Sequence, residues 1–153
     1  MHVKHRSLFI SVLLVGLLLT GCNSNPADHD GETDHFEADA MLVLAGTDTL
    51  LYQHELDGVL ANNDINITEN AASDTIEVFF ESHDGEIFQP LEDHYSLQAA
   101  ISDTTIASVD RFIGKWKIII QGNSSGSTVL SVQLMHDDHA GFTGQPIPVI
   151  VSN

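Results

Sequence analysis

From Met41 to the end of the sequence, short apolar runs alternate with groups of turn-forming residues. Each run has the length of a β-strand, and no helix-length periodic window of comparable quality competes with them. We therefore predict strands over residues 41–45, 49–53, 65–68, 75–82, 94–102, 105–109, 112–121, 127–136 and 146–152. About seven to nine short strands in about 110 residues predict an all-β fold, an antiparallel sandwich of two sheets.

Several of these segments alternate strictly between apolar and polar residues. In one of them Ile76, Val78 and Phe80 would share one face, while Glu77 and Glu81 would point the other way. The apolar faces are expected to meet between the sheets. The same period of two recurs in residues 95–101, 116–120 and 130–134, and it places Trp116 in the core.

Turn signals separate the segments at intervals of about ten residues, as in Asp57-Gly58, His83-Asp84-Gly85 and Gly122–Gly126. The last of these, GNSSG, also fits the G-x-S-x-G pattern of a serine nucleophile. That motif requires a strand leading into a helix. Because residues 127–134 alternate as a strand, we predict a hairpin turn and no catalytic serine there.

The amino-terminal segment has the features of an export signal. Lys4 and Arg6 precede an uncharged apolar run, residues 8–21, which is shorter than a typical membrane-spanning helix of about 20 residues. The run ends in Leu19-Thr20-Gly21-Cys22, which resembles the lipobox of bacterial lipoproteins. In that family the cysteine is diacylated, the signal is cut just before it, and the new amino terminus is usually acylated too. The resemblance implies that Cys22 is lipidated and begins the mature protein.

The expected anchor also indicates a location. One acyl chain binds a membrane only marginally, at roughly 0.8 kcal/mol per buried methylene, whereas two or three chains bind durably. Asn23 follows the cysteine at a position where inner-membrane retention typically uses Asp. By analogy, this favours the outer membrane, at its periplasmic face or at the cell surface.

Residues 23–40 contain six acidic residues, two histidines and no basic residue. This segment shows neither the helical nor the strand period, and it contains too few apolar residues to pack into a core. We therefore predict a flexible tether. The expected organisation is therefore a signal peptide over residues 1–21, a lipidated cysteine and tether over residues 22–40, and a sandwich over residues 41–153.

Charge and cysteine usage exclude several function classes. Without Lys4 and Arg6, three basic residues face 22 acidic ones, a formal net charge of −19. Such a charge repels polyphosphates, so a nucleic-acid partner is not expected. With the single cysteine lipidated, no thiol remains for a disulfide, a metal ligand or a nucleophile.

Metal-ligating patterns are limited to acidic and histidine-containing segments. The acids of DHDGETD, Asp28–Asp34, do not fit an EF-hand loop, because Gly31 stands at position four where position six is required. The sharper candidate is His136-Asp137-Asp138-His139, expected in a loop after a strand. Two imidazoles and a carboxylate can bind zinc or copper. His29, His35, His83 or Asp84 could supply a further ligand. The alternative is a polar loop in which His136 only caps the strand end.

Two segments, SLQAAISDTTIASVD and IIIQGNSSGSTVLSVQL, resemble the second half of a bacterial immunoglobulin-like domain of the group 2 type. The matching positions are Asp103, Ile106, Ala107 and Val109 in the first, and Gly122, Gly126, Ser127, Val129 and Val132 in the second. The resemblance implies an immunoglobulin-like sandwich that acts as a binding or spacing module without its own catalysis. The chain departs from the family in the histidine-rich segment before its last strand.

Together these observations predict a lipid-anchored envelope protein that is not an enzyme. Its partners would be the membrane, through the anchor, and an envelope or surface protein. The sequence identifies no certain cofactor, and a divalent metal belongs to the alternative function. The alternative function is binding of a divalent metal, zinc or copper, by His136 and His139 with Asp137 or Asp138 assisting.

Overall fold

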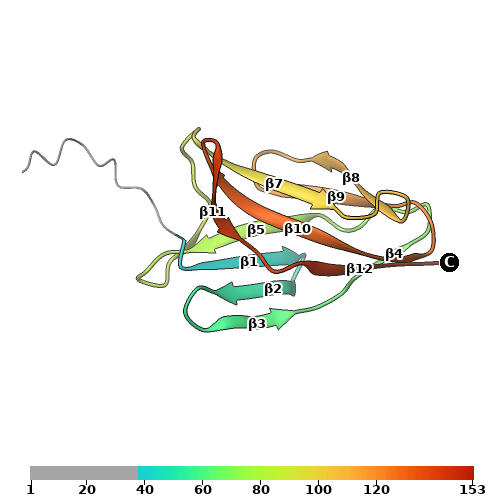
Figure 1. Cartoon of the computed structure of the whole chain (residues 1–153), viewed down its shortest axis with the longest axis horizontal. Coiled ribbons are helices and arrows are strands. Elements are labelled where there is room, and N and C mark those ends of the chain that lie inside the picture. Colours follow the sequence, from blue (N-terminus) through green and yellow to red (C-terminus); the bar gives the residue numbers. More distant parts are fainter. Residues whose placement is uncertain (1–37) are drawn as a thin grey trace, which may run out of the picture. The chain divides into compact units, whose positions relative to one another are not determined.

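A computed structural model of the chain describes residues 38–153, which form two facing β-sheets (Figure 1). The predicted signal peptide, Cys22 and most of the predicted tether lie outside the described residues. Within the described part, no helix has the length and hydropathy of a membrane span. The predicted all-β sandwich is confirmed, with twelve strands among the described residues where about seven to nine were expected.

The first sheet has seven strands in the order β3-β2-β1-β5-β9-β8, with β6 also paired to β5. All of its pairs are antiparallel. The strands are β1 (Ala40–Ala45), β2 (Asp48–His54), β3 (Gly58–Asn62), β5 (Ile76–Glu81), β6 (Ile87–Phe88), β8 (Ala107–Phe112) and β9 (Lys117–Gly122).

The second sheet is built around β10, which pairs with β11 and β12 and also with β7. β4 joins the sheet through β12, and this pair is parallel, unlike the other strand pairs of the described residues. A parallel pair needs a long connection between its strands, and here most of the domain lies between β4 and β12. The strands are β4 (Ile65–Thr68), β7 (Tyr95–Ile101), β10 (Gly126–His136), β11 (His139–Thr143) and β12 (Ile147–Ser152).

The core lies between the inward faces of the two sheets. Ile76, Val78 and Phe80 are fully buried, as their alternation predicted, and Trp116 is buried as well. The Trp116 ring meets Phe80 edge-on at 5.3 Å between ring centroids, and its indole Nε1–H donates a hydrogen bond to the Pro90 carbonyl oxygen at 2.9 Å. The only indole of the chain is therefore packed and hydrogen-bonded inside the core.

The start of the sandwich is also buried. Ala38 is 6% exposed and Ala40 only 1%, while the Asp39 N–H donates to the Glu81 carbonyl oxygen at 2.9 Å. Residues 38–40, which the sequence pattern placed in the tether, thus pack as part of the domain.

The GNSSG segment connects the two sheets, so the predicted hairpin there is wrong. It joins β9 of the first sheet to β10 of the second, and these strands do not pair with each other. Ser124 Oγ donates to the Thr105 carbonyl oxygen at 2.7 Å, and Ser125 Oγ donates to Glu69 at 2.7 Å. A strand follows instead of a helix, as predicted, so the segment lacks the geometry of a nucleophile elbow.

Gly122, where this connection begins, allows the two sheets to approach closely. A Cβ at this position would lie 2.9 Å from the Thr68 carbonyl oxygen and 3.2 Å from a methyl group of Val151. We expect Gly122→Ala to lower the free energy of unfolding by about 1–3 kcal/mol, because backbone must move to relieve the overlap. Urea denaturation measures this value.

Gly141→Ala is the matched control, because its Cβ would meet nothing closer than 3.8 Å. Its effect should stay within about 0.5 kcal/mol. If both variants lost the same free energy of unfolding, the close approach of the sheets at Gly122 would be contradicted.

Candidate functional site

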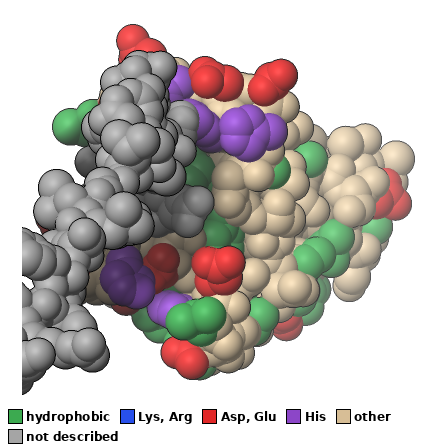
Figure 2. All heavy atoms as spheres, turned by 60° about the vertical axis from the view of Figure 1, so that its left-hand side comes forward, with side chains coloured by type: hydrophobic (Ala, Val, Ile, Leu, Met, Phe, Trp, Pro, Cys, Tyr) green, Lys and Arg blue, Asp and Glu red, His purple; other side chains and the backbone are tan. Residues whose placement is uncertain are grey.

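All five histidines of the described residues lie at one end of the sandwich, which we call the histidine end: His54, His83, His94, His136 and His139. Figure 2 shows histidine side chains among acidic ones on this face. The pairing of the strands explains the gathering. His54 ends β2 opposite Ala40, whereas His136 ends β10 opposite both Tyr95 and His139.

The HDDH motif is a β-hairpin, so the predicted histidine-rich loop is wrong. β10 ends at His136, β11 begins at His139, and Asp137 and Asp138 form the turn between them. Asp137 adopts a left-handed conformation with φ 51°, which Asp tolerates better than most residues. The hairpin places the two imidazoles opposite each other on neighbouring strands.

The hairpin brings three histidine rings and one tyrosine ring together. The ring centroids of His136 and His139 are 5.0 Å apart, and those of His94 and His136 are 5.1 Å apart. Tyr95 stacks on His136 with 4.9 Å between centroids and 24° between planes. His136 therefore occupies the centre of the group.

His94 was not expected in this group. Its carbonyl oxygen accepts a hydrogen bond from the Asp137 N–H at 2.7 Å, which ties it to the hairpin turn. The sequence did contain a clue, the register between two strands. Tyr95 begins one alternating segment and His136 ends another. Antiparallel pairing of the two would have placed His94 beside the turn.

His136 lies at the edge of the core, while His139 is largely in solvent. Their side chains are 13% and 64% exposed. His136 continues the inward face of Leu130, Val132 and Leu134. A cleft of about 850 Å³ opens at this end and is lined by both sheets: by Ala38, Gln53 and Glu55, and by Tyr95, Leu134, His136, Asp137, His139, Ala140, Gly141, Phe142 and Thr143.

The two aspartates of the turn are close to the imidazoles without being hydrogen-bonded to them. Asp137 Oδ2 lies 3.9 Å from His136 Nε2, and Asp138 Oδ1 lies 3.6 Å from His139 Nδ1. Both carboxylates are strongly exposed. Within residues 38–153, no three His, Cys, Asp or Glu side chains are already arranged to hold a metal ion.

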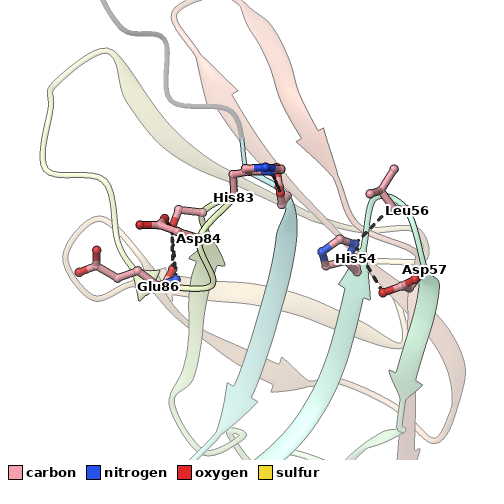
Figure 3. Close-up of polar contacts among 8 residues, drawn as sticks. His54, Leu56, Asp57, His83, Asp84 and Glu86 are labelled. Atoms are coloured by element: carbon pink, nitrogen blue, oxygen red, sulfur yellow. Dashed lines mark hydrogen bonds and ion pairs between the residues drawn. The ribbon is translucent and has the colours of Figure 1, made fainter.

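The other two histidines, His54 at the end of β2 and His83 in the turn between β5 and β6, have local partners (Figure 3). His83 Nδ1 is 3.0 Å from Asp39 Oδ2, and His54 Nδ1 accepts a hydrogen bond from the Leu56 N–H at 3.2 Å. Asp84, which the sequence suggested with His83 as a further ligand, instead accepts a hydrogen bond from the Ser82 hydroxyl at 2.7 Å. This hydrogen bond is the main reason that the pKa of Asp84 is lowered. The structure does not bring His83 and Asp84 into the ring group.

A tyrosine–carboxylate bond further ties the first sheet together at this end. Tyr52 Oη donates to Glu81 Oε2 at 2.7 Å, joining β2 and β5 across β1. This hydrogen bond stabilises the protonated phenol, and it is the main reason that the pKa of Tyr52 is raised. The end of β2, which carries His54, is thereby linked to the end of β5, which leads into the turn with His83.

No protein-family model matches the chain, and no curated protein does either. Solved structures of the S-layer protein SbsC are similar at low level. Its domains 4 and 5 share 16% identity at a TM-score of 0.44, covering 60% of this chain and 49% of that one. Its domains 5–6 share 18% identity at a TM-score of 0.42, covering 59% of this chain and 40% of that one. The chain thus spans at most about half the length of these structures, and a likeness at this level does not indicate function.

The left-handed residue in the turn allows a direct test of the hairpin. We expect Asp137→Val to lower the free energy of unfolding by about 1–2 kcal/mol, because a β-branched side chain is strained at a positive φ. Asp137→Gly should leave it unchanged or raise it slightly. Denaturant titration of both variants measures the difference.

Asp138→Val is the control, since Asp138 does not adopt a positive φ. If both Val variants lost the same stability, strain at Asp137 would not explain the effect.

Proposed function

We propose that the protein is a lipid-anchored bacterial envelope protein whose sandwich acts as a non-catalytic binding or spacing module. The observation that carries this proposal is the Leu19-Thr20-Gly21-Cys22 junction at the end of a short apolar run. Asn23, next to the cysteine, favours the outer membrane. The partner would be an envelope or surface protein.

The charge of the chain supports a spacing role. The mature chain would have a formal net charge of −19, with six acidic residues concentrated in residues 23–40. Anionic lipid headgroups would repel both the tether and the domain. The lipid on Cys22 and this repulsion act in opposite directions, so the sandwich would stand off the bilayer while it remains attached.

Loss of the cysteine tests the anchor. In cells of a bacterium with two membranes, Cys22→Ser should abolish incorporation of a labelled fatty acid and release the protein from the membrane fraction, because the acylated thiol is absent. Labelling followed by fractionation measures both properties.

Asn23→Asp is the matched variant, which should keep the lipid and move the protein to the inner membrane. Continued labelling of the Cys22→Ser protein would refute lipidation at this position.

A second function, binding of zinc or copper, is favoured by the HDDH hairpin. The imidazoles of His136 and His139 lie 5.0 Å apart, and both residues line the cleft at the histidine end. Imidazole is a good ligand for either metal. Asp137 or Asp138 would assist as a ligand or by holding an imidazole tautomer.

Isothermal titration of zinc and copper into residues 23–153 tests this function. We expect a dissociation constant of about 1 μM or tighter, equivalent to about −8 kcal/mol, and its loss in His136→Ala/His139→Ala. His54→Ala/His83→Ala is the control, because it removes two imidazoles from the other sheet at the same end. Weak binding that is equal in all three proteins would assign the hairpin to structure alone.

A further inference from the structure

We infer that His94, His136 and His139 together form a three-imidazole site for a divalent transition-metal ion. This inference rests on the metal-binding function proposed above for the HDDH hairpin. It adds a third ligand from a distant part of the chain.

The ring separations of two histidine pairs match those of imidazoles that share a metal ion. A Zn–N bond is about 2.0–2.1 Å, and the imidazole centre lies about 1.1 Å behind its nitrogen, so two imidazoles on a tetrahedral zinc have centroids about 5 Å apart. The measured separations are 5.1 Å for His94 and His136 and 5.0 Å for His136 and His139. Both pairs include His136, so the rings of His94 and His139 must also turn toward each other to share the ion with it.

The scaffold fixes the central imidazole and leaves the outer two adjustable. His136 is 13% exposed, and the buried Tyr95 ring stacks on it. His94 and His139 are exposed, so their rings can rotate about their side-chain bonds until a nitrogen of each faces the ion. The rings are already close together, and such rotation would bring their nitrogen atoms to a common point.

The backbone holds the three ligands together even though they come from separate segments. His136 and His139 are paired across the two-residue turn. His94 precedes β7, and its carbonyl oxygen accepts the Asp137 N–H at 2.7 Å. A hydrogen bond from the turn therefore positions the third ligand, although it lies far from the HDDH motif in sequence.

The donor set determines the class of ion. Three neutral imidazoles, with a fourth position left for water or a turn carboxylate, suit zinc or copper, whereas calcium and magnesium require oxygen ligands. Asp138 Oδ1, 3.6 Å from His139 Nδ1, can orient that ring. The acidic surface would raise the local concentration of any cation. Selectivity for zinc or copper over calcium therefore separates the imidazole site from general attraction.

The test is competition titration of zinc against a chromophoric chelator in residues 23–153. Loss of an outer-shell partner already costs about 10–100-fold in affinity, so His94→Ala should weaken zinc binding by at least about 100-fold. His54→Ala should have no effect. A millimolar excess of calcium should not displace the zinc. Cobalt(II) absorption provides a second measurement, because loss of one nitrogen ligand changes the visible spectrum of a tetrahedral site.

His94→Phe guards against a variant that fails to fold. This variant retains an aromatic ring beside His136 but has no nitrogen donor. Its free energy of unfolding should equal that of the original protein, while it should bind zinc as weakly as His94→Ala.

The outcomes separate this inference from the function on which it rests. Weak zinc binding in the unaltered chain would overturn both. Tight binding that is lost in His136→Ala/His139→Ala but kept in both His94 variants would leave the metal-binding function standing and overturn the third ligand.

Discussion

The second sheet depends on the hydrogen bonds along both edges of β10. One edge pairs with β7, while the other pairs first with β12 and then with β11, so a single long strand determines where three others lie. Its inward residues Leu130, Val132 and Leu134 are at most 1% exposed, so the strand also supplies the centre of the core. Without a disulfide within residues 38–153, the sandwich depends on this combination of backbone pairing and apolar burial. The same strand ends at His136, and hence the core and the candidate site share one element.

The sequence was sufficient wherever each strand has one buried and one exposed face. Ile76, Val78 and Phe80 are buried as expected, because alternation records directly which side of a strand meets the core. β3 was missed since Val59 and Leu60 are both exposed at the edge of the sheet, where no alternation is required. β11 was missed for a similar reason: its residues His139 to Thr143 are mostly exposed, with only Phe142 buried.

The sequence was insufficient where the answer depends on which strands become neighbours. The residues of GNSSG identify a turn, but turn chemistry is the same whether the flanking strands pair or belong to opposite sheets. The ring group has the same limitation. The HDDH motif shows two close imidazoles, whereas His94 enters only through the register between β7 and β10. Local patterns therefore singled out His136 and His139, whereas pairing over long sequence distances placed His94 beside them.

The parallel pairing of β4 with β12 has a consequence for the order of folding. β4 lies at the edge of its sheet and has β12 as its strand partner, with Ile65 opposite Val149. During synthesis β4 therefore appears early and waits for its partner until nearly all of residues 38–153 have emerged. Contacts between residues so far apart in sequence form slowly. A chain with this topology therefore completes its second sheet only after β12, the last strand of residues 38–153, has been synthesised.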